Sequence, residues 1–170
     1  MASAAPADPG ATTARPERTV GADRSIRAQG RLVGSGARID AHGTDDSADC
    51  VQHSYGQVHD FFREHPCTAL HRAYFRIRDR QGDVVLVAAS WVQMPDEAGA
   101  RALKKLLDVR GTGNVAELSR EQGGYRTVRY TGDASSARRD GSVVANAQAQ
   151  SVAGGATGLE LSTIASDAIG

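Results

Sequence analysis

The fold is decided by residues 84–94, VVLVAASWVQM, where only Ser90 interrupts an apolar run that reaches residue 92. Both alternating sets of positions are apolar, which is typical of a central strand covered on both faces. The preceding residues 70–79 alternate between apolar side chains and arginines, so they are expected to form a strand with one polar face. The turn-forming residues 79–83, DRQGD, join the two segments and predict a hairpin.

Amphipathic helices are expected on both sides of this hairpin. After it, Pro95 is typical of a helix start, and leucines at helical spacing predict a helix over residues 97–108. Before it, apolar side chains recur at helical spacing from Val51 to Phe62, and Pro66 ends that pattern.

A second hairpin is expected in the C-terminal half. Residues 125–131 predict a third strand, residues 132–141 a polar loop, and residues 142–150 a fourth strand with a clear period of two. The capping-box spacing within residues 114–121 predicts a short helix. The resulting fold class is α+β, with a four-stranded, mainly antiparallel sheet of two hairpins and helices on one face.

The N-terminal 48 residues contain no aromatic side chain and only five of the larger aliphatic ones. So few apolar groups do not offset the entropy lost on ordering, which predicts a disordered arm. We therefore expect an arm over residues 1–48, an α+β domain over 49–152, and a Gly-rich tail over 153–170 that contains a weak final helix.

Composition excludes several classes of protein. A length of 170 residues fits one domain. Twenty basic and twenty acidic residues give zero net charge, which excludes a nucleic-acid binder held by bulk charge. No apolar run approaches the ~20 residues of a membrane span. The start, MASAAPADPG, lacks the basic and apolar regions of a secretory signal, so none is expected.

Several segments together carry a family resemblance: VQHSYGQVHDFFREHPC (51–67), AYFRIRD (73–79), GTGNVAELSRE (111–121) and RRDGSVVANAQAQ (138–150). Over residues 50–150 the chain resembles an uncharacterised family of small actinobacterial proteins whose members are often anchored outside the cytoplasm. The resemblance implies an extracytoplasmic or membrane-associated location and brings no catalytic residues with it.

The two cysteines leave three states open. Cys50 and Cys67, with His53 and His71, have the residue types of a zinc site. An unbroken helix after Cys50 would hold the two pairs about 20 Å apart, which argues against both zinc and a disulfide. A break at Gly56 would let the cysteines meet. Two free thiols are the first alternative, followed by a Cys50–Cys67 disulfide, which the location implied by the resemblance supports, and last by a zinc site.

The sequence offers one weak set of catalytic candidates, Cys67 with His71, which would serve a small hydrolase or other thiol enzyme. It contains no established catalytic motif, and no cofactor or metal is expected. Catalysis is therefore an alternative and not the main hypothesis.

The main hypothesis is a non-catalytic binding module for an unknown protein or acidic ligand. Its expected surface is the polar sheet face, with the binding candidates Tyr74, Arg76, Arg78, Arg126 and Tyr130. Arginines interleaved with tyrosines also suit single-stranded nucleic acid, but the mild charge of this region makes that partner the less favoured one. The amide row Asn146, Gln148 and Gln150 is expected to face water.

Overall fold

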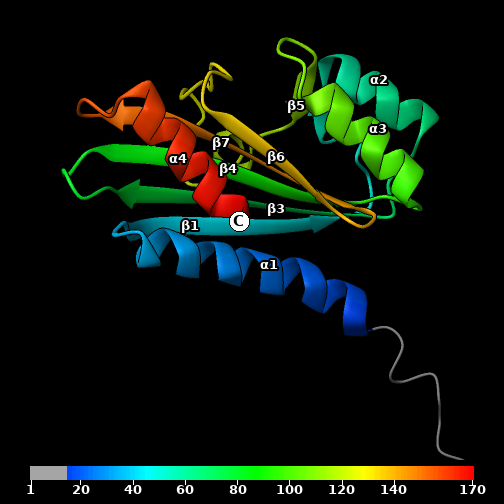
Figure 1. Ribbon diagram of the computed structural model, residues 1–170, viewed down its shortest axis with the longest axis horizontal. Coiled ribbons are helices and arrows are strands. Elements are labelled where there is room, and N and C mark those ends of the chain that lie inside the picture. The colour runs from blue at the N-terminus through cyan, green and yellow to red at the C-terminus, as the bar shows by residue number, and fades with distance from the viewer. Residues whose placement is uncertain (1–14) are drawn as a thin grey trace, which may run out of the picture.

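A computed structural model (Figure 1) describes residues 15–170, and the side chains from residue 21 onward. Its main sheet has five strands in the order β1–β3–β4–β7–β6, and every neighbouring pair is antiparallel. The strands are β1 (Arg38–Ser47), β3 (Ala69–Arg78), β4 (Val84–Gln93), β7 (Val143–Ala153) and β6 (Ser135–Asp140). A second, two-stranded sheet joins β2 (Ser54–Tyr55) to β5 (Gly113–Val115).

The α+β class and the antiparallel sheet are confirmed, and the expected number of four strands is wrong. The apolar run at residues 84–92 lies in β4, at the centre of the five strands, and all of its side chains are buried. The expected hairpin is β3–β4, in which Phe75 faces Val87. A strand hydrogen-bonded on both sides and covered on both faces can be apolar throughout, which explains the run.

Two helices cover one face of the sheet: α1 (Arg15–Gly34) and α4 (Gly158–Ile169). We call this the apolar face. It buries Ala28 and Leu32 from α1 and Ala165, Ala168 and Ile169 from α4 against alternate residues of the three strands β3, β4 and β7. Alanines dominate the contribution of β7 to this core: Ala145, Ala147 and Ala149. Small side chains let the helices approach the sheet closely, which suits a chain with few aromatic residues.

The opposite face, which we call the polar face, is covered by α2 (Gly56–Glu64), α3 (Glu97–Leu107), β5 and the 3-10 turn η2 (Leu118–Arg120). Its apolar core lies at one end, where α2 packs against α3 (Figure 1). That core is formed by Val58, Phe62, Leu70, Val92, Met94, Ala100, Leu103, Val115 and Val144, with Cys50. Helices therefore pack on both faces, and the expectation of helices on one face only is wrong.

The expected disorder of residues 1–48 is wrong from residue 15 onward, and residues 1–14 lie outside the described part of the chain. Over residues 21–34, helix α1 buries two apolar side chains, Ala28 and Leu32, so this part of its sequence lacks a strong apolar stripe. Strand β1 has a polar sequence because it is an edge strand, held by backbone hydrogen bonds to β3. The expected boundary at residue 48 therefore cuts off an edge of the sheet.

The strand expected at residues 125–131 is also wrong. That segment contains a turn, in which Val128 N–H donates to Tyr125 O at 3.1 Å. The third C-terminal element is instead β6, within the segment expected to be a polar loop. As an edge strand β6 needs only its backbone groups to pair with β7. The helix expected at 114–121 is replaced by β5 and η2.

The final helix is confirmed, and it is a packed element of the domain rather than part of a tail. Thr157 and Glu160 form a capping box at the start of α4. At its end, the Arg31 guanidinium donates to the carbonyl oxygens of Asp167 and Ala168 at 2.7 and 2.9 Å. Burial, and then the charges of Arg138 and Arg27, lower the pKa of Arg31.

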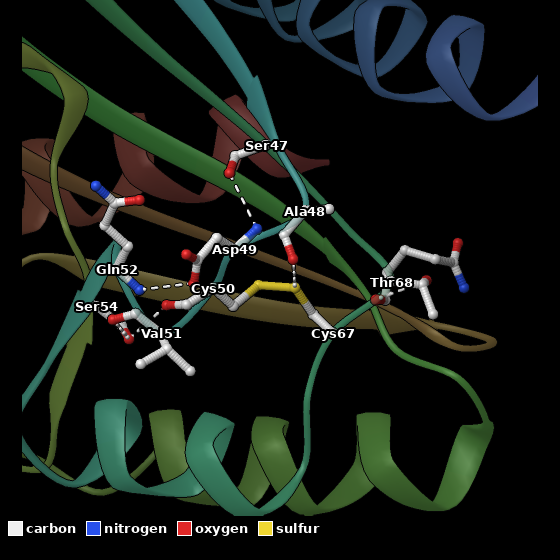
Figure 2. Close-up of a disulfide and its surroundings, with 10 residues drawn as sticks. Ser47, Ala48, Asp49, Cys50, Val51, Gln52, Ser54, Cys67 and Thr68 are labelled. Carbon is white, nitrogen blue, oxygen red and sulfur yellow. Dashed lines mark hydrogen bonds between the residues drawn. A yellow bond between two sulfur atoms is a disulfide. The ribbon is translucent and has the colours of Figure 1, made fainter.

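The helix expected from residue 51 begins at Gly56 instead, and the earlier residues form a turn that Asp49 closes by accepting from Gln52 N–H at 3.0 Å. This break lets Cys50 and Cys67 form a disulfide, with their Cα atoms 6.1 Å apart (Figure 2). Figure 2 also shows the Ala48 carbonyl against the Cys67 sulfur, a contact of 3.8 Å. Among residues 15–170, no helix combines the length and apolarity that crossing a membrane requires.

A polar cleft as candidate functional site

A hollow with a volume of about 510 Å³ lies beside β7 and β6 on the polar face. Its walls come from the loop after α3, from the start of α2, and from residues 130–132. Its floor is formed by strand residues of β5, β6 and β7, among them Asn114, Ala137, Asn146 and Gln148. We call this hollow the polar cleft.

Two glycines set the position of one wall. Gly56 and Gly113 have φ values of 68° and 92°, and they face each other across the small β2–β5 sheet. A Cβ atom on Gly113 would clash with the Tyr55 carbonyl oxygen, and one on Gly56 would lie 2.9 Å from the Gly113 Cα. The close backbone approach that only glycine permits therefore places Tyr55 and Asn114 at the cleft.

The cleft floor is a network of amides. Asn146 Nδ2 donates to Asn114 Oδ1, which also accepts from the Val115 N–H at 2.7 Å. Gln148 Nε2 donates to Glu117 Oε1 at 3.1 Å. Asn146 and Gln148 were expected to face water, and that expectation is wrong: only 6% and 4% of their surfaces are exposed. The β5 and η2 segments cover them and supply the hydrogen-bond partners that buried amides require.

Glu117 lies directly behind the floor and is itself buried, with 5% of its surface exposed. Its Oε1 accepts from the Tyr55 hydroxyl at 2.7 Å as well as from Gln148. Within residues 21–170, no Arg, Lys or His forms an ion pair with this carboxylate. The side-chain groups that donate hydrogen bonds to this carboxylate, the Tyr55 hydroxyl and the Gln148 amide, are both neutral.

Both tyrosines of the cleft are held protonated. Burial, followed by the charge and hydrogen bond of Glu117, raises the pKa of Tyr55 well above its usual value. Burial is also the first cause that raises the pKa of Tyr130, and the hydroxyl of Tyr130 lies 2.8 Å from Ser119 Oγ. These phenols act as neutral hydrogen-bonding groups and not as bases.

Ion pairs lie at the rim of the cleft. Lys104, in the last turn of α3, donates to Asp108, the residue that follows the helix, at 2.5 Å. Arg110 pairs with Asp133, which joins the loop after α3 to the loop before β6. Both members of this second pair are largely exposed, at 74% and 69% of their side chains, so water weakens it.

The structure does not assemble the binding face expected from the sequence. Tyr74 is buried and packs against Tyr125, with ring centroids 6.1 Å apart. Arg76 and Arg78 both donate to Asp40 of β1, at 2.8 and 3.0 Å. Arg126 lies in the turn region after η2, away from the strands, because residues 125–131 are not a strand. Of the five candidates, Tyr130 alone reaches the cleft.

A buried arginine lies where a solvated face was expected. Arg72 is 2% exposed and donates to Asp45 at 2.9 Å, to the Ala116 carbonyl at 3.0 Å, and to Glu121. Burial alone would lower the pKa of Arg72, but hydrogen bonds and charges from Glu121 and Asp45 outweigh it and raise the pKa. This arginine fastens the η2 segment, and hence one side of the cleft, onto the sheet.

The catalytic candidates Cys67 and His71 do not form a thiol site. Both cysteines are joined in the disulfide, so Cys67 has no thiol to ionise and zinc has no thiolate ligands. His71 belongs to the apolar face, opposite the cleft, beside Trp91 at a ring distance of 5.8 Å. Its Nδ1 contacts Asp46 Oδ1 at 2.7 Å.

One acidic cluster could in principle hold a cation: Asp79, Asp83 and Glu160, whose carboxylates offer oxygens within 4.8 Å of one another. Each already accepts backbone N–H groups. Asp79 closes the β3–β4 turn, Asp83 accepts from Gly155, and Glu160 completes the capping box of α4. These bonds give all three carboxylates a structural task.

The cleft was missed in the sequence because its residues come from five separate segments. The one signal available was the amide row of β7, since buried amides on a strand next to the central one mark a polar interior. Comparisons with protein-family models, with curated proteins and with solved structures find no match for this chain, so the family resemblance seen in its sequence stays a prediction.

Proposed function

We propose that this chain is a non-catalytic binding module and that it takes a small polar molecule in the polar cleft. The observation that carries the proposal is an open hollow of about 510 Å³ with a floor of buried amides. Its volume falls within the ~300–1,000 Å³ of ligand sites. The floor amides are hydrogen-bonded to Asn114 and Glu117, which holds them in fixed orientations beside the hollow that a ligand would enter.

The chemistry of the cleft supports binding over catalysis. Two amides and two phenols give donors and acceptors of fixed orientation, held by Glu117, Asn114 and Ser119. The phenols are kept neutral, and the Cys67 sulfur is bonded to Cys50. The described residues that line the cleft include no Cys, His or Lys, and the Tyr55 hydroxyl, which donates to Glu117, keeps its proton because its pKa is raised.

The disulfide supports an extracytoplasmic location for this module. Disulfides persist in oxidising compartments, whereas cytosolic reductants keep most thiols free. The Cys50–Cys67 bond lies between the start of α2 and the start of β3, where Cys50 is buried in the second core. A domain whose packed core includes a disulfide suits an oxidising environment.

The proposal is tested by recording amide NMR spectra of the oxidised protein during titration with a panel of small polar molecules. Ala137→Trp fills the cleft from β6, and Arg138→Trp is the matched control, because the neighbouring side chain points to the other face of the sheet. We expect a bound compound to shift signals of residues 110–114 and 146–148 in the wild type and in Arg138→Trp, and not in Ala137→Trp.

The rival surface has its own variant. Arg76→Glu combined with Arg126→Glu reverses charge on the arginine-bearing face and leaves the cleft unchanged. Loss of ligand binding in this double variant, with binding retained in Ala137→Trp, would replace the cleft by the arginine surface and an acidic partner.

A further inference from the structure

We infer that the ligand of the polar cleft is an organic cation of the alkylammonium class. This inference rests on the proposed function and concerns the same site. It follows from the charge balance around Glu117 and from the aromatic lining of the cleft.

The first step is the uncompensated charge of Glu117. A buried carboxylate is costly unless a cation or several hydrogen bonds balance it. Arg72, the comparable buried charge on this face, has two carboxylate partners. Glu117 has instead the Tyr55 hydroxyl and the Gln148 amide, and no ionic partner in the described residues. A cation in the cleft would supply the missing charge.

The second step is the reach of this charge into the cleft. Gln148 and Tyr55 contact Glu117 with one end and line the cleft. The Glu117 charge also contributes to the raised pKa of both Tyr55 and Tyr130, which lie on different segments of the wall. Glu117 therefore contributes a negative potential at the cleft, and the protein around this buried carboxylate screens it less than open water would.

The third step is the aromatic lining. Tyr55 and Tyr130 both line the hollow, and their hydroxyls are hydrogen-bonded to Glu117 and Ser119. Neutral tyrosine rings attract alkylammonium groups through their negative faces, and sites for quaternary ammonium ions commonly use such rings. Rings with fixed hydroxyls lose little freedom when a cation binds.

The fourth step is the absence of a competing cation on the lining. Arg110 is the one basic residue that borders the cleft among those described, and its guanidinium is exposed and paired with Asp133. Arg120 lies near enough to influence the pKa of Tyr55, but it is exposed and forms no ion pair with Glu117 in the structure. An anionic ligand would meet the Glu117 charge without compensation.

The test compares two probes of equal shape, choline and its neutral analogue 3,3-dimethylbutan-1-ol, by NMR titration of the oxidised protein. We expect choline to bind about tenfold more tightly, or better, because only it interacts with the charge of Glu117. Glu117→Gln keeps a side-chain acceptor for Tyr55 and removes the charge, so it should bring the choline affinity close to that of the neutral probe. Tyr130→Leu should weaken choline several-fold more than the analogue.

The outcomes separate this inference from the proposed function. Equal affinity for both probes in the wild type, or choline binding unchanged in a folded Glu117→Gln, overturns the cation and leaves the binding module standing. Choline binding that survives in Ala137→Trp overturns the cleft as its site. If choline does not bind at all, the cation inference is overturned, and the neutral members of the panel decide the proposed function by themselves. Arg138→Trp serves again as the control outside the cleft.

Discussion

The two faces of the five-stranded sheet solve the same packing problem with different residues. The apolar face buries mostly hydrocarbon beneath α1 and α4, with His71 among its few buried polar groups, and Ala147, Ala165 and Ala168 are fully covered there. The polar face buries Arg72, Glu117, Asn146 and Gln148 beneath a loop, a two-stranded sheet and a single 3-10 turn. Close-packed hydrocarbon gives stability without further conditions, whereas each buried polar group needs a partner of defined geometry. The contrast indicates that one face holds the fold together and the other forms the site.

The largest effect is expected from Phe75→Ala on the apolar face. Phe75 is fully buried between the sheet and the helices, and truncating its side chain leaves a cavity. The free energy of unfolding should therefore fall by about 4 kcal/mol. Chemical denaturation followed by circular dichroism measures this loss. A change below about 1 kcal/mol would show that this face is not the main source of stability.

The disulfide, which anchors the α2 region on the polar face, should have the next largest effect. The Cys50→Ala/Cys67→Ala double variant opens a link between residues 17 positions apart in sequence, which should cost about 3 kcal/mol in the chain-entropy treatment. The single variants Cys50→Ala and Cys67→Ala test whether a newly exposed thiol, and not the lost crosslink, destabilises the domain. If Cys50→Ala alone unfolds the domain and the double variant does not, the effect comes from an exposed thiol instead of the lost crosslink.

Arg72→Met should have a smaller and more local effect. The variant keeps apolar volume and removes four hydrogen bonds, to Ala116 and Glu121 on either side of η2 and to Asp45 of β1. Asp45 and Glu121 are 34% and 45% exposed, so water can solvate the carboxylates that the variant leaves behind. We therefore expect the free energy of unfolding to fall by about 2 kcal/mol, less than for the loss of one partner of a fully buried ion pair. Hydrogen exchange should speed up in residues 116–122 and remain slow in β4. Equal acceleration everywhere would contradict a local fastening role.

The smallest effect at neutral pH is expected from Tyr130→Phe, which sharpens the comparison at high pH. A tyrosine normally has a pKa of about 10. In the folded protein, burial raises the pKa of Tyr130. Above the usual tyrosine pKa, the unfolded chain releases the Tyr130 proton while the folded protein still retains it. The free energy of unfolding of the wild type therefore falls as pH rises. Tyr130→Phe should lose less. Denaturation curves at pH values between about 8 and 11 measure the difference, and parallel curves would contradict the assignment.

The parts of the fold that could be predicted are those whose structure is determined by the sequence of the segment itself. The apolar run of β4 and the Pro95–Asp96 start of α3 predict their elements without reference to the rest. At α3, Asp96 Oδ1 accepts from Gly99 N–H at 2.7 Å, as a cap should. By contrast, the edge strands β1 and β6 depend on backbone bonds offered by β3 and β7, and their sequences RIDAHGTDDS and SSARRD carry no strand signal.

The candidate site was predictable only in fragments for the same reason. The break at Gly56 could be stated as a condition for the disulfide, and the structure meets that condition. The burial of Asn146 and Gln148 could not be predicted, because their covers, Asn114 and Glu117, lie more than thirty residues earlier and in elements expected to be a helix. Side-chain alternation fixes which residues share a face, but what covers that face is a tertiary property.

The irregular edge of β1 has a consequence for behaviour in concentrated solution. The register of β1 shifts between Ile39 and Ala41, and the strand carries three aspartates, Asp40, Asp45 and Asp46. A bulge twists an open edge away from a straight partner, and charged side chains oppose the approach of an identical strand. Copies of this protein should therefore resist joining their sheets edge to edge, and should stay dispersed where a flat, uncharged edge would seed fibrils.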